Sequence, residues 1–178
     1  MPTYLAFLRA INLGAKRVFP KDDIRRAVEA AGFEDVTTHL NTGNIRFGSR
    51  MRSRDRIERA LEREFRSDRG FEVPAIVFEA SEFAALAASA RELSASRPGL
   101  SRHYVYLLKD ELPAEVAARV EATSGPAGEM VVRDRAAHAL LAPGYQHGTV
   151  DPLRAAKLLG VATSRNLNVV TGLAERWC

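Results

Sequence analysis

The 178-residue chain has a single cysteine, Cys178, at its last position. One cysteine excludes an internal disulfide and a metal site built from several cysteines, and this usage is typical of a cytoplasmic protein. Long apolar runs are also missing, and no charged start leads into an apolar stretch with a cleavage signal. The sequence therefore predicts neither a membrane span nor an export signal.

The signatures of several familiar chemistries are absent as well. The four histidines are scattered and form no HExxH or comparable pair, so we expect no metal. No GxSxG, P-loop or dinucleotide-binding motif occurs, and we expect no cofactor. No RNP-like segment accompanies Tyr104 and Tyr106, which argues against an RNA-recognition sheet.

Lysine is scarce, because only four of the 26 basic residues are lysine and the rest are arginine. The 22 acidic residues leave a net charge of only +4. Clustered cations attract phosphate, so nucleic-acid binding through the arginines of residues 50–69 stays open as an alternative. The small net charge does not favour it.

Apolar residues make up 46% of the chain, which is enough for a hydrophobic core. Pro74 lacks an amide hydrogen, so we place the strand that contains it at a sheet edge. The order of elements in the first half is the split βαβ, or ferredoxin-like, pattern. Hydrophobic spacing predicts these elements as a strand at 3–9, a helix at 20–31, a hairpin over 36–47, a helix within 52–70 and a strand at 73–78.

A similar order begins again after a linking helix at 81–91 and a loop, which predicts a structural duplication. Residues 163–177 then have apolar side chains three or four apart, so we expect a helix in place of the fourth strand, capped by Thr163 or Ser164. The elements before it are predicted as a strand at 103–108, a helix at 113–122, strands at 129–133 and 138–142 and a helix at 152–159.

These patterns together predict an α+β protein made of two tandem ferredoxin-like subdomains. The first subdomain covers residues 1–79, and the second covers residues 102–178 and is modified at its C-terminal end. Residues 80–101 form the linking helix and loop between them.

Two polar turns of the first subdomain form the candidate site. The first strand runs into RAINLGAKR, and the hairpin strands are joined by NTGN. In the ferredoxin-like layout both turns lie at the same end of the sheet. Cations, amides and glycine backbone there suit a phosphate or a carboxylate, although asparagine and glycine are also ordinary turn residues. The candidate ligand-binding residues are Arg9, Asn12, Gly14, Lys16, Thr42, Gly43 and Asn44.

A third polar segment, TSRN, begins the last predicted helix. A helix N-terminus favours an anion and Arg165 adds positive charge, whereas ordinary helix capping is the alternative interpretation. Arg165 and Asn166 therefore join the candidate residues. Packing of this helix against the first half would bring all three motifs to one cleft.

The segments LRAINLGAKRVFP, NTGN and TSRNLNVVTGL together resemble the bacterial family known as domain of unknown function 1697. The resemblance covers essentially the whole chain, and it implies an α+β fold and a soluble bacterial protein. The family usually has glycine where this chain has Ala10, and often where it has Ala15, so we expect a stiffer turn here. No reaction is assigned to the family, and the resemblance implies none.

The candidate residues predict a protein that binds a small anionic ligand, such as a nucleotide or a phosphorylated metabolite. Arg9, Lys16 and Arg165 would supply the charge. Whether the protein is also an enzyme stays open, and an unidentified reaction in the same cleft is the main alternative. His39, close to the hairpin turn, is the candidate base for such a reaction.

Overall fold

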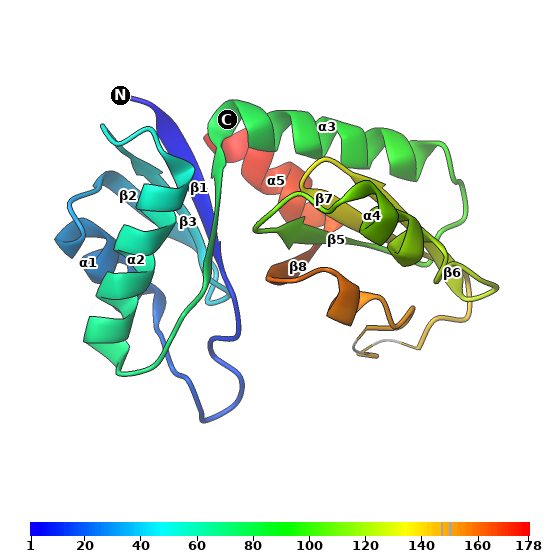
Figure 1. The fold of residues 1–178 in the computed structure, drawn as a ribbon, viewed down its shortest axis with the longest axis horizontal. Coiled ribbons are helices and arrows are strands. Elements are labelled where there is room, and N and C mark those ends of the chain that lie inside the picture. Colours follow the sequence, from blue (N-terminus) through cyan, green and yellow to red (C-terminus); the bar gives the residue numbers. More distant parts are fainter. Residues whose placement is uncertain (147, 150) are drawn as a thin grey trace. The chain divides into compact units, whose positions relative to one another are not determined.

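The computed structural model describes residues 1–146, 148–149 and 151–178. The chain divides into two compact units, residues 1–83 with Trp177 and residues 84–176 with Cys178. Each unit contains a four-stranded antiparallel sheet with helices packed on it (Figure 1). The protein is therefore α+β and has two similar halves.

The first unit has the strand order β2-β3-β1-β4. Its β4 is an edge strand that directly follows Pro74, so the edge position predicted from this proline is confirmed. The hairpin and both helices also lie where the spacing predicts them. The elements are β1 (Thr3–Leu8), α1 (Lys21–Ala30), β2 (Glu34–His39), β3 (Asn44–Gly48), α2 (Arg54–Arg69) and β4 (Ala75–Glu79).

The core of this unit lies between the sheet and the apolar faces of α1 and α2. Ile24 and Val28 of α1 are one turn apart and buried, as are Ile57 and Leu61 of α2. The opposite face of β1 is also covered, because the ring of Phe7 lies 5.0 Å from that of Phe83. A sheet buried on both faces explains why β1 is apolar at almost every position.

Carboxylates of α2 complete the hydrogen bonding of the edge strand β4. Glu62 accepts a hydrogen bond from the amide of Ala75 at 3.0 Å, and Glu58 accepts one from the amide of Val77 at 3.1 Å. Glu58 is only 3% exposed although its side chain is polar, and this bond accounts for its burial. These two acidic residues of α2 therefore stabilise the edge strand β4.

The second unit repeats the strand arrangement as β6-β7-β5-β8. A long helix, α3 (Ala80–Ala95), leads into it and ends four residues later than predicted. None of the helices in the described residues is long and apolar enough to span a membrane. The elements after α3 are β5 (Arg102–Leu108), α4 (Ala114–Glu121), β6 (Gly128–Arg133), β7 (Ala136–Leu141), the 3-10 turn η1 (Ala156–Leu158), β8 (Ala162–Asn166) and α5 (Leu167–Trp177).

The predicted loss of the fourth strand is wrong. Residues 162–166 form β8 beside β5, so Thr163 and Ser164 lie in a strand and do not cap the helix. The cap of α5 is Asn166, whose Oδ1 accepts the amide hydrogen of Val169 at 2.9 Å. The helical spacing that begins at Leu167 concealed the short strand before it.

The predicted helix at 152–159 is also wrong, because only the single turn η1 forms there. Asp151 and Arg154 have φ values of +52° and +58°, which an α-helix does not allow. Oδ1 of Asp151 instead accepts the amide hydrogens of Ala155 and Ala156 at 2.9 and 3.0 Å. This local turn competes with a helix.

Gly43 lies close to the side chain of Leu8 and provides a test of the packing. Its φ is +76°, and an added Cβ would lie 2.7 Å from the Cβ of Leu8. We expect Gly43→Ala to lower the free energy of unfolding by about 3 kcal/mol, measured in urea, from backbone strain and overpacking together. Gly70 has the same φ and nothing within 4 Å of an added Cβ, so Gly70→Ala should cost only about 1 kcal/mol. Equal losses of unfolding free energy in the two variants would show that the contact with Leu8 does not determine the cost of the Gly43 substitution.

Candidate functional site

The two turns predicted to be neighbours do lie side by side in the first unit. The amide of Leu8, at the end of β1, donates a hydrogen bond to the carbonyl of Gly43 at 2.9 Å. Nδ2 of Asn12 donates to the carbonyl of Asn41 at 2.7 Å. The juxtaposition expected from strand order alone is therefore present, and we call residues 9–19 and 41–44 the paired turns.

The asparagines of the paired turns hold the backbone together. Oδ1 of Asn12 accepts the amide hydrogen of Phe19 at 2.7 Å, and Nδ2 donates to the carbonyls of Phe19 and Asn41. Both amide hydrogens of this side chain are therefore used inside the protein. Asn44 is fully buried, and its Nδ2 donates to the carbonyl of His39 and to Oγ1 of Thr42, both at 2.9 Å.

Arg17 also stabilises the first of the paired turns. Its Nε donates to the carbonyl of Ala10 at 2.5 Å, its guanidinium donates to the carbonyl of Glu72, and it lies 4.7 Å from the ring centroid of Phe71. Ala10 has a φ of +56°, the left-handed region that favours glycine. The alanine is thus held in a conformation that a glycine would adopt with less strain.

The remaining predicted residues of the paired turns are on the surface. Arg9, Gly14 and Lys16 are exposed, and Gly14 has a φ of +64° with nothing within 4 Å of an added Cβ. The charged side chains predicted to bind a ligand are therefore accessible, whereas the amides predicted to orient it are committed to the fold.

Arg165 and Asn166 belong to the second unit. Arg165 lies in β8 opposite Val105, and it donates hydrogen bonds to Oγ1 of Thr163 at 2.9 Å and to the carbonyl of Ser164 at 2.8 Å. Burial lowers the pKa of Arg165 to about 10, so the guanidinium stays charged at neutral pH. A single cleft shared by these two residues and the paired turns stays a prediction.

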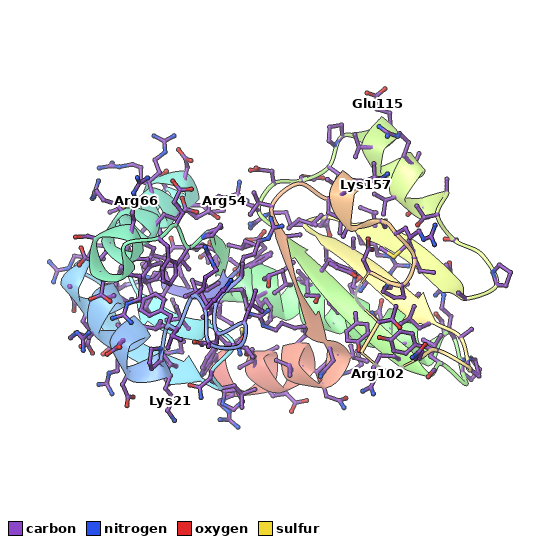
Figure 2. The ribbon with its side chains drawn as sticks, turned by 90° about the horizontal axis from the view of Figure 1, so that it is seen from below. Lys21, Arg54, Arg66, Arg102, Glu115 and Lys157 are labelled. Atoms are coloured by element: carbon purple, nitrogen blue, oxygen red, sulfur yellow. The ribbon has the colours of Figure 1, made fainter. Side chains whose placement is uncertain are left out.

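A cavity of about 180 Å³ lies at the N-terminus of α5 and is formed entirely by the second unit. The first amides of an α-helix have no partner within the helix, and the helix dipole is positive at this end. Figure 2 labels Arg102, which brings a positive charge to the cavity wall from the start of β5. We call this space the α5 cavity, and its polar lining includes Ser94, Ser101, Arg102, His103, Asn166 and Asn168.

A buried pair of histidines adjoins the α5 cavity. Nε2 of His103 lies 3.0 Å from Nδ1 of His138, and the two side chains are 5% and 1% exposed. Burial lowers the pKa of His103 to about 4, with a smaller contribution from Arg97. Burial also lowers the pKa of His138 to about 3, with contributions from His103 and Arg133. Both rings are therefore neutral at pH 7.

The second ring nitrogen of His103 has no hydrogen-bond partner in the part of the chain that the structure describes. Its Nδ1 is buried and finds no donor or acceptor within the described residues. Such an atom costs free energy unless a partner binds it, and His103 is part of the lining of the α5 cavity. The sequence did not indicate this pair, because only strand register brings His103, opposite Leu140, close to His138, opposite Val105.

Comparison with known proteins gives the family. Residues 1–138 match the family described as "Protein of unknown function (DUF1697)". The chain belongs to this family. The DUF1697 assignment confirms the resemblance seen in LRAINLGAKRVFP and NTGN, whereas TSRNLNVVTGL lies beyond the matched residues.

The fold of this DUF1697 chain is similar to a solved structure described as conserved bacterial protein SP0830 from Streptococcus pneumoniae. The TM-score is 0.75, with 21% sequence identity over 99% of each chain. A comparison with curated proteins gives no match. Family and fold are thus established, and function has to be inferred from the residues.

We expect Asn12 to be essential to the stability of residues 9–19, the first of the paired turns. Asn12→Ala removes three hydrogen bonds and leaves the Phe19 amide and two carbonyls without this partner, so we expect a loss of about 2–3 kcal/mol in urea unfolding. Asn41 contributes only its backbone carbonyl, so Asn41→Ala should change stability by less than about 0.5 kcal/mol. A neutral Asn12→Ala would show that the loop is held by other contacts.

The histidine pair should not titrate in the physiological range. We expect the ring NMR signals of His103 and His138 to stay constant from pH 8 to about pH 5 in the folded protein. Histidines of the urea-unfolded chain should titrate near pH 6.5. Because the folded pKa values are lower, the unfolded chain takes up protons first as the pH falls below about 6.5, and the pair then lowers stability. Ring signals that titrate near pH 6.5 in the folded state would contradict this account.

Proposed function

We propose that the protein binds a small anionic ligand, such as a nucleotide or a phosphorylated metabolite, in the α5 cavity. The observation that carries the proposal is His103, a side chain of the lining of a polar cavity whose buried Nδ1 has no partner among the described residues. We infer that an atom of the ligand is the partner of this nitrogen. The helix N-terminus and Arg102 determine the sign of the charge that the cavity favours.

The histidine pair is able to present a hydrogen to an anion without a protonated ring. When His138 donates its Nδ1 hydrogen to Nε2 of His103, the neutral His103 carries its own hydrogen on Nδ1. An anion in the α5 cavity then accepts from Nδ1 of His103, and the positive end of the α5 dipole stabilises its charge. The low pKa of His103 is compatible with this role, because no imidazolium is required.

The arginines of α2 give less support to nucleic-acid binding than the α5 cavity gives to the binding of a small anion. Arg59 lies 2.6 Å from Asp55, and Arg66 lies 2.8 Å from Glu72. Arg69 pairs with both Asp68 and Asp23. Carboxylates beside these arginines reduce the positive potential that a phosphate backbone needs.

We further infer that each half is a ferredoxin-like subdomain, the second with η1 in place of its second helix and with α5 added after its last strand, and that the two arose by duplication. The matching strand orders β2-β3-β1-β4 and β6-β7-β5-β8 support this, since each strand of the second half takes the place of its counterpart in the first. The proposed subdomains are residues 1–79 and 102–178, linked by 80–101.

The proposal is tested by calorimetric titration with inorganic phosphate and with AMP at low salt. Asn168→Asp is the informative variant, because a carboxylate in the first turn of α5 stabilises the helix while it repels an anion. We expect affinity to fall at least about tenfold, or roughly 1.4 kcal/mol, with an unchanged or higher melting temperature. Arg9→Ala, at the exposed end of β1, should leave the affinity unchanged.

Two results would overturn this assignment. A loss of binding in Arg9→Ala, with full binding in Asn168→Asp, would move the anion from the α5 cavity to the paired turns. Failure of both phosphate and AMP to bind the wild-type protein at millimolar concentration would reject a small-anion site in either place.

A further inference from the structure

A second cavity of the same unit is lined by tyrosines. It has a volume of about 290 Å³ and lies on the opposite face of the sheet from His103, because Tyr104 and Tyr106 alternate with His103 along β5. Its walls include residues of β5, of β8 and of the segment before η1. The lining includes the polar or aromatic residues Tyr104, Tyr106, Tyr145, Thr149, Asp151 and Ser164.

The tyrosine rings are fixed at an angle to one another. The rings of Tyr104 and Tyr145 are 6.2 Å apart between centroids and are inclined at 75°. Their hydroxyls lie 3.5 Å apart, and the hydroxyl of Tyr145 donates to the carbonyl of Thr149 at 3.1 Å. Tyr106 adds a third ring two residues along β5. Three aromatic rings therefore contribute to the lining of one small cavity.

The charge in the lining of this cavity is negative, while Arg102, outside the lining, lies close enough to Tyr145 to act on its hydroxyl electrostatically. Asp151 is the charged residue of its lining, and no lysine or arginine of the described chain contributes to the wall. Oδ1 of Asp151 accepts two amide hydrogens from the start of η1, which holds the carboxylate in place. Burial and the nearby Asp151 raise the pKa of Tyr106 to about 12, so this phenol is neutral at physiological pH.

We propose that this tyrosine cavity binds a small organic cation of the methylated ammonium class. The faces of tyrosine rings attract a cation through their quadrupole, and the attraction increases when the cation is desolvated. Methyl groups on the nitrogen lower the cost of that desolvation and fill the apolar part of the cavity, while Asp151 balances the charge. The same features disfavour an anion, so this site is independent of the one at the N-terminus of α5.

Two variants separate the charge from the rings. Asp151→Asn keeps an Oδ1 acceptor for the amides of Ala155 and Ala156 and removes only the negative charge. Tyr145→Phe keeps the aromatic face, whereas Tyr145→Leu removes it. Comparison of the two substitutions at Tyr145 distinguishes cation–π binding from loss of the hydroxyl bond to Thr149.

The experiment is a titration of the full chain with choline chloride, followed by the ring NMR signals of the three tyrosines at constant ionic strength. The neutral comparison ligand is 3,3-dimethyl-1-butanol, which has the shape of choline without its charge. We expect choline to shift the tyrosine signals and to bind at least about fivefold more tightly than the alcohol. Asp151→Asn and Tyr145→Leu should each weaken choline at least about fivefold, and Tyr145→Phe should stay within about twofold.

Three results would overturn the proposal. Equal affinity for the alcohol would mean an apolar cavity without cation recognition. Unchanged tyrosine signals at saturating choline would mean that the ring of Tyr145 only packs against Tyr104 of the sheet. Undiminished choline binding in Asp151→Asn, together with equal losses in both Tyr145 variants, would leave neither the carboxylate nor the ring face with a role.

Discussion

The architecture of the first unit depends on one close approach of two backbones. Gly43 passes so near the end of β1 that its carbonyl accepts the Leu8 amide, and no side chain fits between them. Asn12 then joins the same two segments through its carboxamide. These contacts determine how the chain leaves the sheet, so the surface position of Arg9 and Lys16 follows from packing at a glycine.

In the second unit, the two cavities depend on the alternation of side chains along β5. His103 lines the α5 cavity and joins the histidine pair, whereas its neighbours on the other face of β5, Tyr104 and Tyr106, line the tyrosine cavity. One strand thereby contributes to the two cavities for which we propose ligands of opposite charge. A shift of register by one residue would exchange them, so the pairing of β5 with β7 and β8 specifies both sites at once.

Much of the fold was predictable because its cues are local or topological. Pro74 marked an edge strand, and strand order alone brought Asn12 near Asn41. The roles of the turn residues were not predictable, because an asparagine that stabilises a turn and one that binds a ligand look the same in a sequence. His103 and His138 are 35 residues apart and meet only through strand register, which no periodicity reveals.

The carboxylates that bond to the edge strands have a consequence for assembly. The amides of Ala75 and Val77 in β4 are occupied by α2, and in β6 the amide of Val132 donates to Glu121 at 3.0 Å. A foreign strand that docked beside β4 or β6 would have to displace these charged acceptors before it gained a single ladder bond. Each half of the molecule thus resists growth of its sheet into a larger, intermolecular one at that border.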